Sequence, residues 1–158
     1  PLSTTISTEV INIDIQPGDH GSTFGGGPVT TAVAAKVWDI INEPKFLTKV
    51  RTSAAILESN LLKITDDFSF CGHLLGEGML RGIPINLPDK PDNQAEQTKN
   101  DPPLKRIMEI CRENGLLILR AGANVLRIAP PLIASEKDIQ RGTAILRKAL
   151  QKIETDYQ

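Results

Sequence analysis

The residues best suited to chemistry lie in one short stretch, HGSTFGGGPV, which begins at His20. It offers two side-chain hydroxyls, Ser22 and Thr23, and then three consecutive glycines before Pro28, a residue favoured in the first turn of a helix. Hydroxyls, glycine amides and a helix N-terminus together can hold a phosphate. No Gly-Lys-Ser/Thr follows, and no strand leads directly into a Gly-x-Gly-x-x-Gly turn, so the two common nucleotide loops are excluded. From residue types alone, an anion-binding loop and a plain structural turn both stay open.

Charge and hydropathy narrow the range of partners. The chain has 158 residues, of which 18 are Lys or Arg and 19 are Asp or Glu, so its net charge is -1. Without a basic excess, we expect neither nucleic acid nor a membrane surface as a partner. No apolar run approaches the roughly 18 residues that span a bilayer, and the first residues lack a secretory pattern. We therefore expect a globular protein of the cytoplasm or the mitochondrial matrix.

The few cysteines and histidines argue against a metal site. Cys71 and Cys111 are far apart in sequence and lie in apolar contexts, which favours buried free thiols over a disulfide or a metal pair. Two histidines are too few for a typical zinc site. We expect His20 to make a turn hydrogen bond, His73 to pack against apolar neighbours, and Trp38 to lie in a core or an interface.

Hydrophobic spacing predicts the elements of the first half. Residues 2–15 are rich in Ser, Thr, Ile and Val, which is typical of a strand or an extended segment. From Pro28 onward, apolar residues recur every three or four positions, which indicates an amphipathic helix interrupted at Pro44. A second helical pattern then continues to Ile64, so the pair predicts one long, bent helical arm.

The second half predicts a small mixed subdomain. Glycines 72, 76, 78 and 82 among short apolar groups indicate a hairpin or a bulged strand pair. Residues 87–103 are polar and proline-rich, which indicates a surface loop, with a lid as the less favoured alternative. There follow a short helix that stops near Gly115, two strands joined by an AGA turn, and a last helix capped by Ser135 and Asp138. Helices on one side of a small sheet would make this an α+β subdomain.

Three segments, in order, resemble one family. HGSTFGGGPVTTAVAAKVWDIIN resembles the H-G-[ST]-T-[YF]-G-G-N-P-L-A segment of class III pyridoxal-phosphate aminotransferases. LGEGMLRGI is similar to their R-G-x-G-L-[ML]-x-G segment, and GLLILRAGANVLRIAPPLIASEKDI is similar to their tail around N-V-[VL]-R. KVWDIINEPKFL and AGANVLRIAPPL look most like acetylornithine and succinylornithine aminotransferases. Together these segments cover most of the chain.

The resemblance implies an α/β fold, namely the C-terminal part of a fold-type I aminotransferase with an α+β small C-terminal domain. Residues 1–44 would hold the end of the large cofactor-binding domain and the start of an interdomain helix, and residues 45–158 would form the small domain. The implied cofactor is pyridoxal 5'-phosphate, the substrates are small amino and keto acids, and no metal is implied. A homodimer, or a missing N-terminal portion or partner chain, would complete the site.

The resemblance also implies roles for three residues. Thr23 would hydrogen-bond the cofactor phosphate across a dimer interface, and Ser22 would line the same pocket near the substrate. Arg127, at the arginine of N-V-[VL]-R, would bind a substrate carboxylate, because a planar guanidinium matches a carboxylate with two parallel hydrogen bonds. The alternative for Arg127 is a strand-end arginine in a structural salt bridge.

The chain departs from the family pattern at three points. The lysine that forms a Schiff base with the cofactor has no counterpart here, since in the family it precedes the segment that resembles residues 1–10. Gly27 replaces the usual asparagine, and Leu75 stands where the arginine of R-G-x-G is expected. No catalytic residue is therefore assigned within this chain.

The leading hypothesis is amino-group transfer between an N-acylornithine and 2-oxoglutarate, a step of arginine metabolism. This chain would supply the phosphate loop and the carboxylate-binding arginine. One alternative, favoured by the absent lysine, is a non-catalytic aminotransferase fragment that serves as a structural or assembly subunit. Another is a split enzyme whose lysine lies on a partner chain. The retained Ser22, Thr23 and Arg127 favour the first hypothesis, because a purely structural subunit has no physical need for both kinds of anion-binding group.

Overall fold

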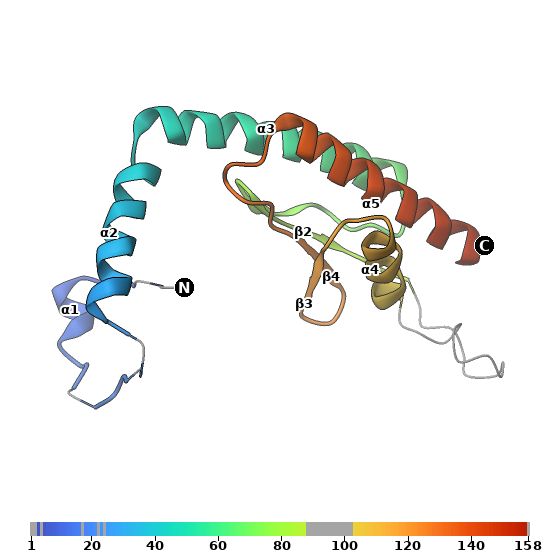
Figure 1. The fold of residues 1–158 in the computed structure, drawn as a ribbon. Coiled ribbons are helices and arrows are strands. Elements are labelled where there is room, and N and C mark those ends of the chain that lie inside the picture. The colour runs from blue at the N-terminus through green and yellow to red at the C-terminus, as the bar shows by residue number, and fades with distance from the viewer. Residues whose placement is uncertain are drawn as a thin grey trace. The chain divides into compact units, whose positions relative to one another are not determined.

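The structure is a computed structural model that describes residues 3, 5–16, 18–21, 23, 25–87 and 103–157. The chain divides into two units, Pro1–Leu47 and Thr48–Gln158, and each unit is described by itself (Figure 1). The assignment of residues 1–44 and 45–158 to two domains of the aminotransferase family stays a prediction. No helix within the described ranges is long and apolar enough to cross a membrane.

The first unit begins with a correction. The strand or extended segment expected over residues 2–15 is wrong for Glu9–Asn12, which forms the short helix α1, in which the backbone N–H groups of Ile11 and Asn12 both donate to the Thr8 carbonyl at 3.1 Å. β-branched residues favour a strand only where a neighbouring strand can pair with them. Among the described residues of this unit, none forms a strand that could do so.

Helix α2 (Pro28–Ile41) confirms the amphipathic pattern that begins at Pro28. None of its residues is buried within the unit. Val29 is 75% exposed and Trp38 is 57% exposed, so Trp38 is not a core residue of this unit. The predicted single arm is two helices, since α2 ends before Asn42 and α3 (Pro44–Asp67) starts afresh at a proline, whose missing N–H is tolerated in a first turn.

The second unit contains a sheet of four antiparallel strands. They are β1 (Leu75–Glu77), β2 (Leu80–Pro84), β3 (Leu119–Ala121) and β4 (Val125–Ile128), and their order across the sheet is β1-β2-β4-β3. The hairpin predicted around the glycines and the strand pair joined by the AGA turn are both confirmed. The central pairing of β2 with β4 joins the two hairpins.

Gly76 shows why the first hairpin needs a glycine. Its φ angle is +83°, a backbone conformation that residues other than glycine rarely adopt. A Cβ atom at this position would lie 2.3 Å from the Leu80 carbonyl oxygen. The backbone of β1 therefore approaches β2 at a point where only glycine fits.

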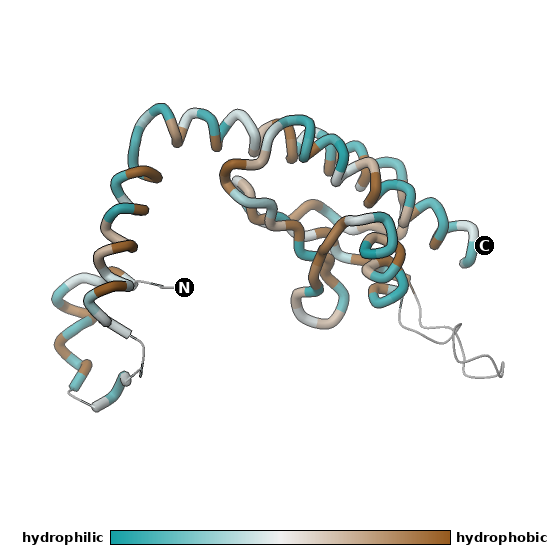
Figure 2. Tube along the Cα trace, in the orientation of Figure 1, coloured by the Kyte–Doolittle hydropathy of each residue, from teal (hydrophilic) through white to brown (hydrophobic). Residues whose placement is uncertain are grey.

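Helices cover one face of this sheet. α4 (Pro103–Glu113) ends close to Gly115, as predicted, and α5 (Glu136–Tyr157) is the last helix. α3 and α5 lie side by side and run in the same direction, since Ser53 donates to the Ala134 carbonyl at one end and Arg147 pairs with Asp67 at the other (Figure 1). Figure 2 shows apolar positions recurring along both helices and along the strands.

The core of the second unit lies between these helices and the inner face of the sheet. Its largest fully buried side chains come from three helices and two strands, and they are Leu57, Leu61, Ile64, Ile83, Ile107, Leu126, Leu146, Leu150 and Ile153. Full burial of one such side chain contributes about 1.5–3 kcal/mol. The opposite face of the sheet keeps its leucines exposed, with Leu80 58% and Leu119 56% accessible.

The N-terminal cap of α5 confirms the predicted pairing of Ser135 with Asp138. The Asp138 backbone N–H donates to the Ser135 hydroxyl at 3.2 Å, and the Ser135 backbone N–H donates to the Asp138 carboxylate at 3.0 Å. The Ser135 hydroxyl also donates to that carboxylate at 2.6 Å. These hydrogen bonds from the Ser135 side chain and backbone hold the pKa of Asp138 below its ordinary value of 3.8.

Replacing Ser135 with Ala should lower the free energy of unfolding by about 1 kcal/mol, because the helix loses its cap. Urea unfolding followed by circular dichroism measures this loss. Ser59→Ala, at an exposed position within α3, should leave stability unchanged or slightly higher.

The contribution of the cap should also depend on pH. Since the pKa of Asp138 is lowered in the folded chain, its stabilisation is present above pH 3.8 and is lost as the pH falls through the folded-state pKa. The gap between the parent chain and Ser135→Ala should therefore narrow in acid. A gap that is the same at pH 7 and in strong acid would contradict this cap.

Candidate functional site

Arg127 lies on β4 with its side chain on the face of the sheet opposite the core. Successive side chains of a strand point to opposite faces, and Leu126 is 0% exposed on the inner side. Arg127 is exposed, as the alternation requires. The strand therefore presents the Arg127 guanidinium outward, while the side chain of Leu126 packs the strand against the core.

A row of four residues crosses the outer face at Arg127. Leu75 pairs with Gly82, Gly82 pairs with Arg127, and Arg127 pairs with Leu119. A Cβ atom at Gly82 would lie 2.9 Å from Cγ1 of Val125, so this position stays bare for steric reasons. Arg127 thus has a side-chain-free neighbour on one strand and an exposed leucine on the other. Because Leu75 replaces the family's arginine, the row holds one cation.

Arg127 has no partner within the described part of the chain. The ion pairs found there involve other residues, and no hydrogen bond of its guanidinium occurs among them. No carboxylate among the described residues forms the structural salt bridge that was the alternative for Arg127. An arginine with free planar donors on an apolar face is chemically suited to a carboxylate from outside.

The predicted phosphate turn lies in the first unit. Thr23 is exposed in the turn before α2, and its hydroxyl makes no hydrogen bond to another described residue. Gly26 has a φ angle of +73° and leads into Gly27, the N-cap residue of α2. Ser22, the other predicted residue of this turn, lies outside the described residues.

The start of α2 fits an anion in its chemistry. The Gly27 carbonyl accepts the Thr30 hydroxyl at 2.8 Å and the Thr31 hydroxyl at 3.0 Å, but no side chain caps the first N–H groups of the helix. An asparagine at position 27 would bring an oxygen able to accept from those groups, and glycine brings none. The N–H groups of the first turn, the positive end of the helix dipole and the Thr23 hydroxyl together suit a phosphate.

Thr23 belongs to the first unit and Arg127 to the second, so the structure describes these two candidate anion sites separately. Their chemistry differs. The first offers backbone donors and a hydroxyl, whereas the second offers a charged, bidentate fork.

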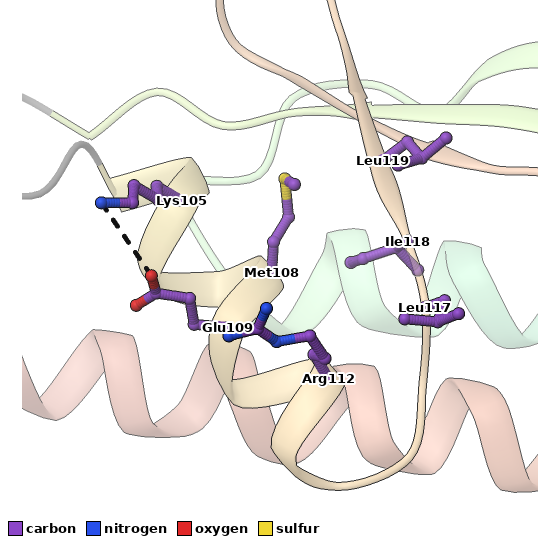
Figure 3. A pocket seen from close by; sticks show the side chains of 7 residues that line it. All are labelled: Lys105, Met108, Glu109, Arg112, Leu117, Ile118 and Leu119. Carbon is purple, nitrogen blue, oxygen red and sulfur yellow. Dashed lines mark ion pairs between the residues drawn. The ribbon is translucent and has the colours of Figure 1, made fainter.

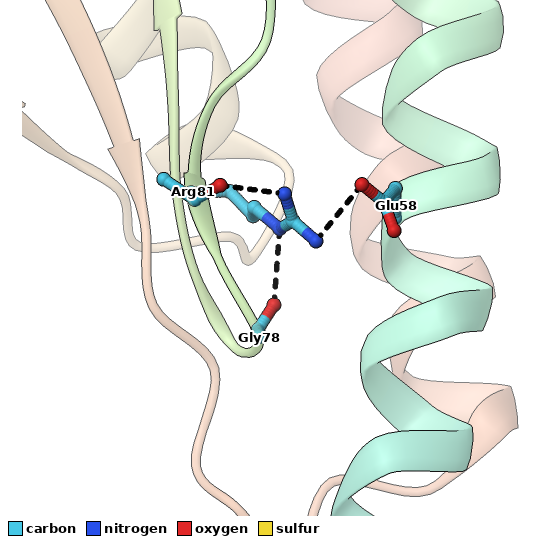
Figure 4. A network of polar contacts seen from close by, with 4 residues as sticks. Glu58, Gly78 and Arg81 are labelled. Atoms are coloured by element: carbon cyan, nitrogen blue, oxygen red, sulfur yellow. Dashed lines mark hydrogen bonds and ion pairs between the residues drawn. The ribbon is translucent and has the colours of Figure 1, made fainter.

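Arg81, which residue type and spacing alone did not single out, is 7% exposed on β2 (Figure 4). Its Nε donates to the Gly78 carbonyl at 3.1 Å and its Nη1 donates to the Gly76 carbonyl at 2.7 Å. Its Nη2 lies 3.1 Å from Oε1 of Glu58 on α3. Arg81 thus ties the β1–β2 turn to the helix that covers the sheet. The signal was available, since strand alternation puts Arg81 on the same face as the buried Ile83.

The remaining candidates show no sign of chemistry. Cys71 and Cys111 are free, as predicted, and burial raises the pKa of Cys111 to about 11. Burial, with a smaller effect of the Glu154 charge, raises the pKa of Cys71 to about 12, so both thiols stay protonated at neutral pH. His73 is exposed, so its expected packing is wrong. Across the described ranges, no three His, Cys, Asp or Glu residues gather to hold a metal ion.

The comparison with protein families matches the chain to one of them. The family model of class-III aminotransferases matches residues 1–150. The chain therefore belongs to the class-III aminotransferase family, as its three motifs predicted.

Curated relatives include aminotransferases of bacteria. The chain is 34% identical over 153 residues to the acetylornithine/succinyldiaminopimelate aminotransferase of Photorhabdus laumondii, which covers 97% of this chain and 35% of that protein. It is 34% identical over 150 residues to an acetylornithine aminotransferase of Neisseria meningitidis, with 95% of this chain and 35% of that protein covered. The chain thus spans about a third of the length of these relatives and corresponds to their C-terminal part.

Solved structures agree with the sequence comparison. The acetylornithine aminotransferase of Elizabethkingia anophelis matches with a TM-score of 0.66 and 28% identity, over 87% of this chain and 33% of that one. An S-selective transaminase from Arthrobacter sp. matches with a TM-score of 0.71 and 25% identity, over 92% of this chain and 33% of that one. The predicted fold, the C-terminal part of a pyridoxal-phosphate aminotransferase with a small α+β unit, is therefore confirmed.

Replacing Arg81 with Met should lower the free energy of unfolding by about 2–4 kcal/mol, because two turn carbonyls and Glu58 lose their charged donor. Urea unfolding of the second unit, followed by the near-ultraviolet signal, measures the loss. Glu58→Gln is the matched control, and its cost should be about 1 kcal/mol or less because Glu58 is 45% exposed. Equal losses in the two variants would show that the ion pair, and not the turn contacts, gives Arg81 its effect.

Proposed function

We propose that this chain supplies two anion-binding parts of a pyridoxal-phosphate-dependent aminotransferase that moves an amino group between an N-acylornithine and 2-oxoglutarate. The observation that carries the proposal is Arg127, whose guanidinium lies on the outer face of the sheet without a partner among the described residues, at the family's N-V-[VL]-R position. Membership of the aminotransferase family and the likeness to acetylornithine aminotransferases support it.

Arg127 would hold the carboxylate of the amino or keto acid. Its fork offers two parallel N–H donors, which fix both the position and the orientation of a carboxylate. The exposed Leu119 beside it and the bare Gly82 opposite would leave room for the substrate while limiting water around the ion pair. A charge pair in such an environment is less screened than one in open solvent.

Thr23, Ser22 and the first N–H groups of α2 would hold the cofactor, Thr23 at its phosphate and Ser22 near the substrate. Pyridoxal 5'-phosphate, when bound, supplies an electron sink for the transfer of the amino group. The residues of this chain would bind and orient, since no catalytic lysine is assigned among them. A homodimer, an N-terminal portion or a partner chain would bring that lysine, and the cytoplasm or the mitochondrial matrix would be the place of action. The comparisons lend no support to the alternative of a non-catalytic subunit.

Replacing Arg127 with Ala should weaken binding of 2-oxoglutarate by about 2–4 kcal/mol, because the carboxylate loses a bidentate charged partner. The Michaelis constant and kcat/KM for 2-oxoglutarate in the assembled enzyme measure the effect, with cofactor absorbance as a check on the fold. Arg120→Ala is the matched control, since Arg120 is also exposed but lies outside the row of Arg127. Unchanged acceptor kinetics in Arg127→Ala would remove Arg127 from the site.

Replacing Thr23 with Ala should weaken cofactor binding by about 1.5–3 kcal/mol, the range for a hydrogen bond to a charged group. The cofactor that remains after extensive dialysis, read from its absorbance, measures the effect. Thr23→Ser keeps the hydroxyl and should keep the cofactor. If Thr23→Ala retains cofactor as well as the parent enzyme does, the phosphate role is contradicted.

A further inference from the structure

A pocket lies in the second unit, between α4 and the extended segment that leads into β3 (Figure 3). Its volume is about 310 Å³, at the lower end of the range of small-molecule sites. Its lining residues lie between positions 105 and 119, and neither Thr23 nor Arg127 is among them. Leu119 is among them, and it also pairs with Arg127 in the sheet, so the pocket adjoins the row of Arg127 at Leu119 and has a wall of its own on α4.

One side of this pocket is apolar. Met108 points from α4 toward the extended segment, and Ile118 points from that segment back toward the helix (Figure 3). Ile118 is 8% exposed and belongs to the core, so it forms a fixed floor. Leu117 is 83% exposed at the same pocket, although the core of the unit gains nothing from a leucine there. An apolar ligand body would cover Leu117 and Met108 at once.

The charges at the rim favour an anion. The Glu109 carboxylate lies 4.0 Å from Nζ of Lys105 and 3.9 Å from Nη1 of Arg106, so its charge is already balanced. Arg112, one helical turn after Met108, makes no ion pair within the described ranges. Its position in the last turn of α4 suits the helix dipole, and its guanidinium makes no hydrogen bond to another described residue. The lining thus has two cations and one anion.

We propose that this pocket binds a small monocarboxylate with a hydrocarbon chain of about six to eight carbons, a size that a cavity near 300 Å³ can hold. The chain would lie over Met108, Ile118 and Leu117, and the carboxylate would meet Arg112. Charge complementarity selects an anion over a neutral or cationic molecule, and the narrow apolar floor selects an aliphatic tail.

Octanoate is the probe for this pocket. The chain contains two methionines, Met79 and Met108, and only Met108 lines the pocket. With ¹³C-methyl methionine in the intact protein, octanoate should shift the Met108 methyl resonance in a saturable way and leave the Met79 resonance unmoved. Met108→Leu assigns the signal. Equal shifts of both resonances, or none that saturates, would overturn the proposal.

Arg112→Gln should raise the dissociation constant of octanoate about fivefold, the effect of one partly exposed charge pair. Arg51→Gln, an exposed arginine on α3 outside the pocket, is the matched control and should change nothing. Leu117→Asp should abolish binding without affecting the fold, because Leu117 is 83% exposed and the new carboxylate repels the ligand. Octanol that binds as tightly as octanoate, or Arg112→Gln that binds like Arg51→Gln, would contradict the carboxylate site.

Discussion

The inward packing of β2 and β4 is the constraint on which the candidate carboxylate site depends. Ile83 and Leu126 are both 0% exposed against the helices, so each strand has one face fixed. A register shift of one residue would expose these side chains and turn Arg127 into the core, where an unpaired charge costs several kcal/mol. The outward guanidinium is therefore a consequence of how tightly its neighbour Leu126 is buried, and the row from Leu75 to Leu119 follows from the same register.

A buried charge on the inner face also stabilises this sheet. Arg81 projects inward where the alternation calls for an apolar residue, and it meets two turn carbonyls and Glu58 there. Burial of a guanidinium is unfavourable unless its donors are satisfied, and three contacts satisfy it here. Arg81, which points inward, and Arg127, which points outward, thus have opposite roles. Arg81 finds its partners within the second unit and fixes structure, whereas Arg127 has no partner among the described residues.

The two candidate anion sites differ in a way that suits two different ligands. The start of α2 offers backbone N–H groups and a hydroxyl, which can surround the several oxygens of a phosphate. Arg127 offers a flat fork, which matches the flat carboxylate. The proposed function needs both kinds of recognition, because the proposed cofactor carries a phosphate and the proposed substrates carry carboxylates. The pocket beside α4 differs from both because its floor is apolar and its charge lies at the rim.

The sequence determined the family, most elements and the candidate residues, because local signals specify them. Helical spacing predicted α2, α4 and α5, glycine-rich turns predicted the two hairpins, and Ser135 with Asp138 predicted a cap that the structure contains. The composition of residues 2–15 favoured a strand or an extended segment, whereas Glu9–Asn12 forms a helix. β-branched residues favour a strand only where a partner strand exists, and the presence of a partner strand is not a local property of the sequence. The interruption predicted at Pro44 is the point where α3 begins, so the expected arm consists of two helices.

Only the tertiary structure decided which charged side chains have ion-pair or hydrogen-bond partners among the described residues. Arg81 and Arg127 are both strand arginines in glycine-containing surroundings, and nothing local to either one shows that the first finds Glu58 on α3 and that the second finds no described acid. The same holds for the pocket beside α4, since Met108 and Leu117 meet only after the chain turns back at Gly115. Residue type and spacing fix what a side chain can do. Which groups surround it depends on contacts between segments far apart in sequence, and those exist only in the folded chain.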